Sequence, residues 1–359
     1  QVLISKKYLK MSNYKLVPKI TISDNTSEVF CVRFSPDGKF LAAGCGDGAI
    51  RVFNTTTGNL AYNLQGGSNA SLPTTAIRFR PITASTRTKN VFLAANATGV
   101  IQHWHMTSGK CLHSAEDQGN QVYALDYNDD GARFATAGKD TFIRVYEEAT
   151  KSVICTMKGG RGYSSKEAPG HSNRVFSCKF VPGNENLIIS GGWDNTVQIW
   201  DIREGCAVRS IFGPHICGDS LDMVGNEVVT GSWRPGNQLE VWDFTTGNKI
   251  QDIPWASGGT AAAPSSVFAS VGQPACMLYA AQFSKEGQGR FIGAGGSGQN
   301  EAKIFDHQNG NETVGTITGL ERGVFAIDFS PDATSNNQVV AIAGGDSSVR
   351  ILEITPNTA

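Results

Sequence analysis

Three of the six histidines in this sequence lie close together, and imidazole is the side chain best suited to metal binding or acid–base chemistry. His103 and His105 flank Trp104, so a β-strand would place both rings on one face, with His113 as a third candidate ligand. No cluster of Cys or carboxylate residues lies nearby to complete a zinc site. We therefore predict no metal, and we interpret these histidines as an exposed strand face with Trp104 in a structural position.

Two glycine-rich runs, 44–48 and 295–298, raise the possibility of phosphate-binding loops. Such a loop needs a following helix whose N-terminus faces the phosphate, whereas both runs lie between two segments with strand character. The G-x-S-x-G and H-E-x-x-H motifs of hydrolases are absent from the sequence. We predict that the protein is not an enzyme and has no cofactor.

Composition narrows the class of partner and the compartment. The formal net charge of the 359 residues is −1, so no overall basic field favours nucleic acid or an anionic membrane. The eight cysteines form no C-x-x-C pair, and no run of 18 apolar residues occurs, which favours reduced thiols in a cytoplasmic protein. The sequence does not begin with Met, and Met11 is a candidate start, so residues 1–14 are expected to be an extension.

One pattern recurs along the chain: an apolar residue, two residues, a second apolar residue, one residue, and a large apolar anchor. The anchors are Phe34, Phe79, Tyr127, Phe180, Met223, Phe283 and Phe329. Their spacings of 45, 48, 53, 43, 60 and 46 residues indicate seven repeats of one supersecondary unit with loop insertions.

The remainder of each repeat predicts three further strands. Residues 187–201 give the clearest copy, with apolar alternation through Val197 and Ile199 after a hairpin turn at Asp194-Asn195. No segment has a helical period of useful length. Seven four-stranded antiparallel units predict an all-β, seven-bladed β-propeller.

Residues 170–201 resemble the WD-repeat family position by position, at Gly170-His171, Ser190, Asp194 and Trp200-Asp201. The resemblance implies a buried hydrogen-bonded tetrad of His171, Ser190, Asp194 and Trp200 within the fourth blade. In the first blade, Phe53 and Ala43 occupy the positions of the Trp and the Ser, so Asp47 is expected to lack side-chain partners.

The two ends of the chain are expected to close the ring. The last blade is one strand short, and residues 15–23 form a strand with no blade of its own. Pairing that strand into blade seven removes an exposed edge, and Pro18 is tolerated because an outermost strand leaves some N–H groups unpaired. The propeller is therefore predicted to span residues 15–355, with a C-terminal tail at 356–359.

A binding site is expected where the inner strands begin. The three-then-two apolar spacing breaks strict alternation, so each inner strand is predicted to contain a β-bulge that turns one residue away from the core. Those residues are Phe30, Thr75, Tyr123, Phe176, Asp219, Tyr279 and Phe325. The resemblance places them on the top face, where WD-repeat proteins bind peptides, with Trp193 and Lys139 as further contacts. The alternative is that the aromatic rings pack on one another and plug the channel.

These features predict a non-catalytic scaffold or adaptor that binds peptide segments or subunits on its faces. Five aromatic rings and the Asp219 carboxylate suit an Arg or Lys side chain of the partner. We expect a monomer that acts within a larger complex, with a cytoskeletal or ciliary assembly as one setting suggested by the family. The alternative is an enzyme or small-ligand binder that uses the central channel. The long connections at 159–173 and 254–276, the second with Val267-Phe268, are either binding loops or disordered.

Overall fold

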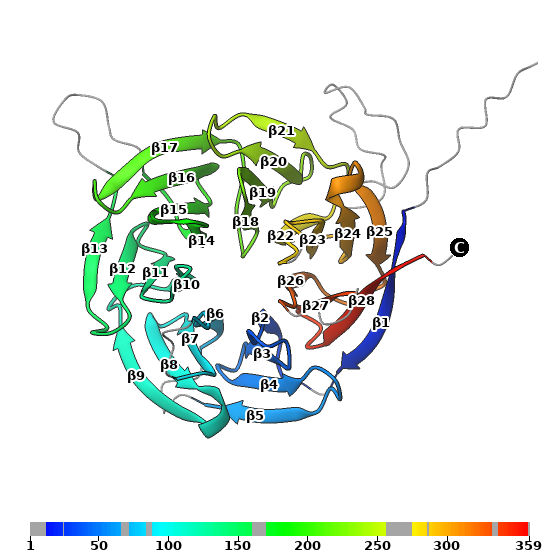
Figure 1. Ribbon diagram of the computed structural model, residues 1–359, viewed down its shortest axis with the longest axis horizontal. Helices are drawn as coiled ribbons and strands as arrows, with labels where there is room; N and C mark the ends of the chain where they lie inside the picture. The colour runs from blue at the N-terminus through cyan, green and yellow to red at the C-terminus, as the bar shows by residue number, and fades with distance from the viewer. Residues whose placement is uncertain are drawn as a thin grey trace, which may run out of the picture.

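The repeats of the sequence fold into sheets that stand side by side around a central axis. The computed structural model describes residues 12–23, 25–65, 72–83, 88–159, 170–255, 275–285, 287–331 and 337–357. In these ranges, 28 strands form seven four-stranded antiparallel sheets, and β2, β6, β10, β14, β18, β22 and β26 are the innermost strands (Figure 1). The predicted seven-bladed β-propeller is confirmed.

The blades follow one another in chain order. Blade one contains β2 (Val29–Phe34), β3 (Phe40–Cys45), β4 (Ile50–Asn54) and β5 (Leu60–Leu64). Blade two contains β6 (Thr74–Phe79), β7 (Val91–Asn96), β8 (Val100–His105) and β9 (Lys110–Glu116). Blade three contains β10 (Val122–Tyr127), β11 (Arg133–Gly138), β12 (Ile143–Glu147) and β13 (Val153–Met157). Blade four contains β14 (Val175–Val181), β15 (Asn184–Gly192), β16 (Thr196–Asp201) and β17 (Cys206–Phe212).

Blade five contains β18 (Leu221–Val224), β19 (Glu227–Gly231), β20 (Leu239–Asp243) and β21 (Lys249–Asp252). Blade six contains β22 (Met277–Phe283), β23 (Phe291–Ser297), β24 (Ala302–Asp306) and β25 (Glu312–Ile317). Blade seven contains β26 (Val324–Phe329), β27 (Gln338–Gly344), β28 (Val349–Pro356) and β1 (Tyr14–Ile22). The helical structure in the described residues consists of two 3-10 turns, Met106–Ser108 and His307–Asn309, and no helix there is long and apolar enough to cross a membrane.

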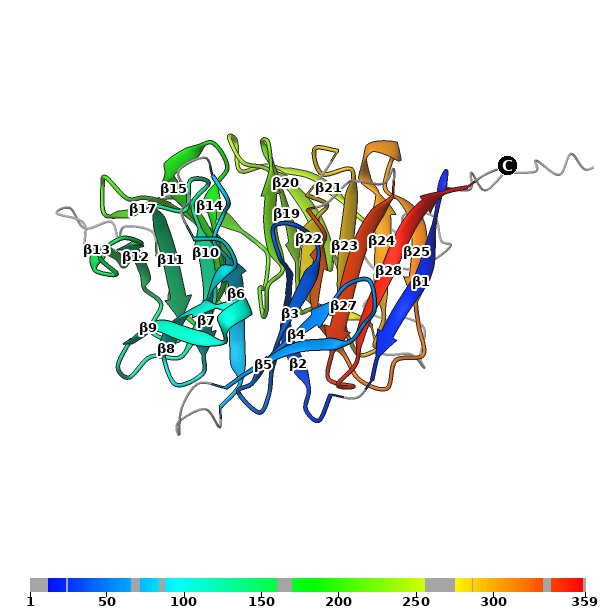
Figure 2. The ribbon, with the colours of Figure 1, turned by 60° about the horizontal axis from the view of Figure 1, so that its bottom comes forward.

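The hydrophobic core lies between the blades, because each twisted sheet buries both of its faces against its neighbours (Figure 2). Seven clusters of buried apolar residues occur in the described chain, one at each junction of neighbouring blades. Phe180 and Trp200 of blade four, for example, pack with Ala135 and Val145 of blade three. The seven predicted anchors lie at or one residue before the ends of the inner strands.

The ring closes through the pairing of the two ends of the chain. β1 pairs antiparallel with β28 from Tyr14↔Pro356 to Ile22↔Val349, with a shift in register between Pro18 and Ile20. Figure 1 shows β1 in dark blue along the outside of the red β28. The predicted closure is confirmed, and the paired strands extend one residue beyond each predicted limit of the propeller.

The predicted bulges are present in six of the seven inner strands that the structure describes. The register shifts across Phe30, Thr75, Tyr123, Phe176, Tyr279 and Phe325, each of which lies between two residues that keep their partners. The prediction is wrong for blade five, where β18 begins at Leu221 and pairs with β19 in regular register. Asp219 lies in the segment before that strand.

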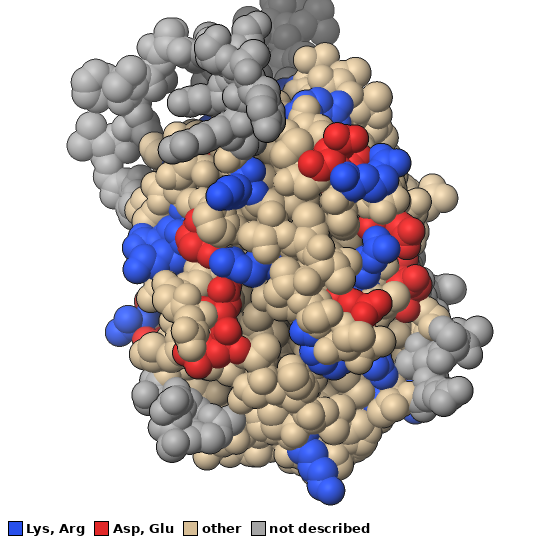
Figure 3. All heavy atoms as spheres, turned by 90° about the vertical axis from the view of Figure 1, so that its left-hand side faces the viewer, with Lys and Arg blue, Asp and Glu red and all other residues tan. Residues whose placement is uncertain are grey.

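Several sequence-based expectations concern segments outside the described ranges or on the outer surface. Met11, Val267, Phe268 and most of both long connections lie outside the described residues. The side of the ring in Figure 3 carries small mixed groups of acidic and basic side chains separated by uncharged surface. Among the described residues on that face, the basic side chains form no continuous surface of the kind that binds a nucleic acid.

Candidate partner-binding site

A cavity of about 370 Å³ lies where the inner strands begin. All seven residues predicted to turn toward this opening line it, one from each blade. They are Phe30, Thr75, Tyr123, Phe176, Asp219, Tyr279 and Phe325. The bulges place equivalent positions of six blades at one mouth, and Asp219 joins them from the segment before β18, so seven residues that are far apart in the sequence form a single wall.

The aromatic rings of this wall pack on one another in two groups. Phe30 stacks on Phe325 with ring centres 5.5 Å apart, and Tyr279 meets the edge of Phe325 at 5.4 Å. On the other side, Tyr123 stacks on Phe176 at 4.7 Å. The rings are partly accessible, with Phe30 37% exposed. The wall therefore combines ring–ring packing with an open apolar surface.

The two further predicted contacts differ in their relation to the cavity. Trp193 lies 5.2 Å from Phe176 between ring centres, and its Nε1 donates to Cys217 Sγ at 2.8 Å. The guanidinium of Arg174 covers the Trp193 ring at 5.1 Å. Trp193 thus adjoins the aromatic wall through Phe176, whereas Lys139 is exposed, and neither Trp193 nor Lys139 is among the residues that line the cavity.

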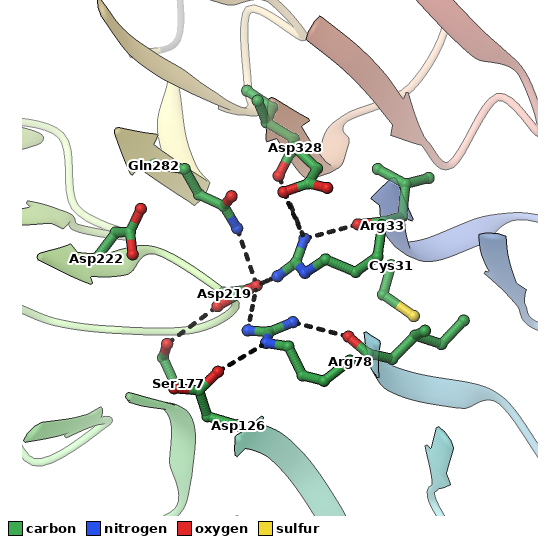
Figure 4. A network of polar contacts seen from close by, with 12 residues as sticks. Cys31, Arg33, Arg78, Asp126, Ser177, Asp219, Asp222, Gln282 and Asp328 are labelled. Atoms are coloured by element: carbon green, nitrogen blue, oxygen red, sulfur yellow. Dashed lines mark hydrogen bonds and ion pairs between the residues drawn. The ribbon is translucent and has the colours of Figure 1, made fainter. Parts of the chain in front are cut away.

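Among the polar side chains that line the cavity, Asp219 contacts the largest number of other side chains (Figure 4). Its Oδ2 pairs with the guanidinium groups of Arg33 and Arg78, the second at 2.9 Å, and accepts Gln282 Nε2 at 3.1 Å. Its Oδ1 accepts the Ser177 hydroxyl at 3.1 Å. A cationic side chain of a partner, as expected from the sequence, would meet a carboxylate that is already paired within the chain.

Asp219 belongs to a longer row of ion pairs in which positive and negative charges alternate. The order is Asp126, Arg78, Asp219, Arg33, Asp328, Lys285, Asp222 and Lys179. The Arg78–Asp219 contact of 2.9 Å is among the short ones, and the longest, Lys285–Asp328, is 4.0 Å. The row contains residues from all seven blades, and its four cations balance its four carboxylates.

Burial strongly affects the pKa values in this row. Removal from water, together with the charge of Arg78, lowers the pKa of Arg33 to about 10. Burial alone would raise the pKa of Asp222, but Lys179 and Lys285 outweigh it and lower that pKa to about 2. Burial lowers the pKa of Lys179 to about 8 despite Asp222. Near neutral pH, Asp222 and Arg33 are therefore charged, and Lys179 is mostly charged.

Three carboxylates of the row also join neighbouring blades through the backbone. Asp328 accepts the amide of Phe34 at 2.8 Å, Asp126 that of Phe180 at 2.9 Å, and Asp222 that of Phe283 at 3.0 Å. In each case the acceptor lies on one inner strand and the donor on the next. The row thus fixes the spacing of the blades as well as the base of the cavity.

This row was not predicted from the sequence, although the sequence contains a signal for it. The residue directly before each anchor is charged or amidic in all seven repeats. These residues are Arg33, Arg78, Asp126, Lys179, Asp222, Gln282 and Asp328. A polar residue at that position of a buried strand requires polar partners across the axis.

The tetrad residues of blade four are hydrogen-bonded as a chain. His171 Nδ1 lies 2.8 Å from Asp194 Oδ2, and Nε2 lies 2.7 Å from Ser190 Oγ. Because an ionised carboxylate only accepts, Nδ1–H donates to Asp194 and Nε2 accepts the Ser190 hydroxyl proton. Trp200 Nε1 donates to the same hydroxyl oxygen at 2.7 Å. The arrangement links β15 and β16 to the loop that precedes β14.

Asp47 of blade one has a side-chain partner, contrary to our expectation. Arg51, four residues later on β4, donates through Nη2 to Asp47 Oδ2 at 2.5 Å. Asp140 with Arg144 and Asp346 with Arg350 repeat this pair at the same spacing. Arg51 lies four residues after Asp47 and outside the tetrad positions, from which the absence of a partner was expected.

The three histidines of blade two contact neighbouring side chains of the chain. His103 is buried, and its Nε2 lies 3.0 Å from Glu148 Oε2, so the expectation of an exposed face is wrong for this residue. His113 packs against it with ring centres 5.7 Å apart, and His105 Nδ1 contacts Ser108 at 2.8 Å. No group of three potential metal ligands is found within the described residues.

Comparison with known proteins shows which family of repeats this chain resembles. A family model described as "WD domain, G-beta repeat" matches residues 16–54, 109–147 and 162–201. The chain is 21% identical over 329 residues to the ribosome biogenesis protein WDR12 homolog of Drosophila mojavensis, covering 89% of this chain and 71% of the relative.

Two relatives from Schizosaccharomyces pombe are similar over shorter stretches. The WD repeat-containing protein slp1 is 21% identical over 244 residues, which are 66% of this chain and 46% of slp1. The U3 small nucleolar RNA-associated protein 21 homolog is 26% identical over 195 residues, 54% of this chain and 19% of the relative. The chain thus spans less than half the length of both.

Proposed function

Because this chain belongs to the WD-repeat family of β-propellers, we propose that it is a non-catalytic interaction module that binds a segment of a partner protein in the cavity at the mouth of its ring. The observation that carries the proposal is the cavity itself: one residue from each of seven blades lines it, and five of those residues are aromatic. Concave apolar sites with a few polar groups are the usual form of ligand sites.

The partial exposure of the rings supports binding over simple plugging of the channel. Rings that served only to fill the axis would be buried, whereas Phe30 is 37% exposed and the other four rings of the wall are partly accessible. Trp and Tyr are enriched among the residues that dominate binding energy at protein interfaces. Trp193, Tyr123 and Tyr279 place such side chains around one opening.

The partner and the setting are part of the same proposal. We propose a peptide segment as the bound element and a monomeric chain that acts inside a larger complex. The relatives' names mention ribosome biogenesis and a small nucleolar RNA-associated protein, so they favour a nuclear setting as much as the cytoplasmic, cytoskeletal or ciliary one expected from the sequence. Location of the tagged protein in cells distinguishes these settings.

A double substitution tests the site. Phe176→Ala with Trp193→Ala removes two touching rings of the wall and should weaken the partner by about 2 kcal/mol or more, at little cost to stability. The partner is first captured with the native protein and identified by mass spectrometry, and its dissociation constant is then measured for each variant. The matched control is Leu112→Ala with Ile154→Ala, which removes two exposed apolar side chains from outer strands.

The control should bind as the native protein does. A double variant of the wall that melts at a lower temperature and retains the partner would indicate that the rings only pack on one another. A clean monomer that binds a metabolite, with no stoichiometric protein partner, would overturn the proposal.

A further inference from the structure

We infer that the side chain that enters this cavity is an uncharged aromatic or large aliphatic one, and not the Arg or Lys expected from the sequence. The inference rests on the proposed function, since it names the chemical class of the bound segment. It follows from how fully the charges at the cavity are already paired.

The carboxylate that would attract a cation has no unused oxygen. Asp219 is the one acidic residue among the described residues that line the cavity. Its Oδ2 is ion-paired with Arg33 and accepts hydrogen bonds from Arg78 and Gln282, and its Oδ1 accepts the Ser177 hydroxyl. These four groups occupy the roughly four acceptor positions of a carboxylate. A Lys or Arg of the partner would have to displace one of these donors.

The cation at the cavity is equally occupied, so an acidic side chain is not favoured either. Arg78 Nε donates to Asp126 at 3.3 Å, and Nη1 donates to the carbonyl oxygen of Ile77 at 2.9 Å. Its Nη2 donates to Asp219 at 2.9 Å. Each of the three guanidinium nitrogens therefore has a partner within the chain.

The neutrality of the whole row strengthens this conclusion. Four cations and four carboxylates alternate across the seven blades, so a fifth cation would lose its hydration without gaining an unpaired carboxylate. An uncharged side chain makes no such demand. Charge complementarity thus selects against both signs and leaves apolar contact as the source of affinity.

The walls supply that contact. Besides the aromatic rings, the cavity is lined by Ala76, Ala97, Ala124 and Leu125, and by the Cys31 side chain. The Thr75 hydroxyl donates to the carbonyl oxygen of Val122, and the Tyr123 hydroxyl donates to Gln121. These polar atoms are already bonded, so the available surface is apolar and suits stacking with an aromatic ring.

Selection of displayed random peptides on the full chain tests the inference. Peptides are enriched on the native protein and then counter-selected on Tyr279→Ala with Phe176→Ala, after its melting temperature has shown that this variant folds. Pocket-dependent peptides should share one aromatic or large aliphatic anchor. Replacing that anchor with Ala or with Lys should weaken binding about 30-fold. The dissociation constant should change less than about threefold between 50 and 500 mM salt.

Two results overturn the inference in distinguishable ways. Peptides that share an Arg or Lys anchor, bind much more weakly in high salt and lose affinity on Asp219→Asn would show that the chemistry is cationic, while the proposed site stands. The absence of any peptide that depends on the cavity would remove the proposed peptide site together with the inference.

Discussion

A single carboxylate, Asp194, holds the polar chain of blade four in place. It accepts from the His171 ring, from the Ser172 amide at 2.9 Å and from the Thr196 hydroxyl at 2.8 Å. Asp194→Ala leaves the buried His171 ring and the buried Thr196 hydroxyl without this acceptor and should lower the free energy of unfolding by about 1–3 kcal/mol. Asp47→Ala, which breaks the more exposed pair with Arg51 and the hydrogen bond from the Ala49 amide, should cost about 0–1 kcal/mol. Denaturant titration measures both, and equal losses would contradict the distinction.

The pH dependence of stability, measured for the native protein and for Asp194→Asn, provides a second test of this carboxylate. Burial alone would raise the pKa of Asp194, but the hydrogen bonds from His171, Ser172 and Thr196 outweigh it and hold the pKa below its ordinary value. The unfolded chain then binds the proton more readily, so this stabilisation is complete above about pH 4 and is lost as the pH falls through the folded pKa. The stability gap between the native protein and Asp194→Asn should therefore be constant from pH 7 to about pH 5 and should narrow below about pH 4.

Asp219 has a structural role that can be separated from binding. Asp219→Ala removes the shared partner of two nearly buried guanidiniums, whose side chains are 8% and 11% exposed, and should destabilise the protein by about 3 kcal/mol. Asp219→Asn retains hydrogen-bond acceptance through one oxygen and should cost less. Thermal melting of the two variants beside Asp47→Ala measures the effect. An unchanged melting temperature for Asp219→Ala would mean that Asp126 and Asp328 compensate for the lost carboxylate.

At the scale of elements, the strand β1 closes the ring by pairing with β28. A chain that begins at Asn25 lacks β1 and leaves the edge of β28 unpaired, with Leu16 and Ile20 removed from the junctions of blade seven with blades six and one. It should melt at a lower temperature and self-associate through the free edge. The control begins at Ser12 and keeps β1 whole. Light scattering and amide exchange of the β28 residues report the change, and equal protection in both chains would contradict it.

The sequence predicted the number of blades and the mouth residues because both depend on local periodicity. The position after the first apolar residue of each repeat identified Phe176 and Tyr279 without knowledge of their neighbours. Blade five departed from the rule, since β18 is short and Asp219 lies before it rather than in a bulge. The copy of the pattern in that blade, which ends at Met223, is one of the two weaker copies, together with the one that ends at Phe79.

The polar partners of the site could not be predicted in the same way. Arg33 and Asp219 are 186 positions apart, and only the closure of the ring brings them together. The Asp219 carboxylate at a rim of aromatic rings suggested a cationic ligand. The cations that already pair with it, Arg33 and Arg78, lie on other repeats, so the pattern within one repeat did not reveal them. The role of a charged residue in a propeller thus depends on the opposite blades, which the spacing within one repeat does not reveal.

For the molecule as a whole, the pairing of β1 with β28 also determines how the ring responds to mechanical load. Tyr14 pairs with Pro356, so both ends of the chain leave the ladder at the same end of one antiparallel pair. Tension applied through the two ends is therefore perpendicular to the strands and separates their hydrogen bonds one after another, instead of shearing them all at once. Such a load would unzip the closing strand and open the ring before any single blade unravels. A complex that pulls on both flanks of this chain would therefore separate β1 from β28 at low force. A complex that holds the cavity and a single flank would not pull these two strands apart in this way.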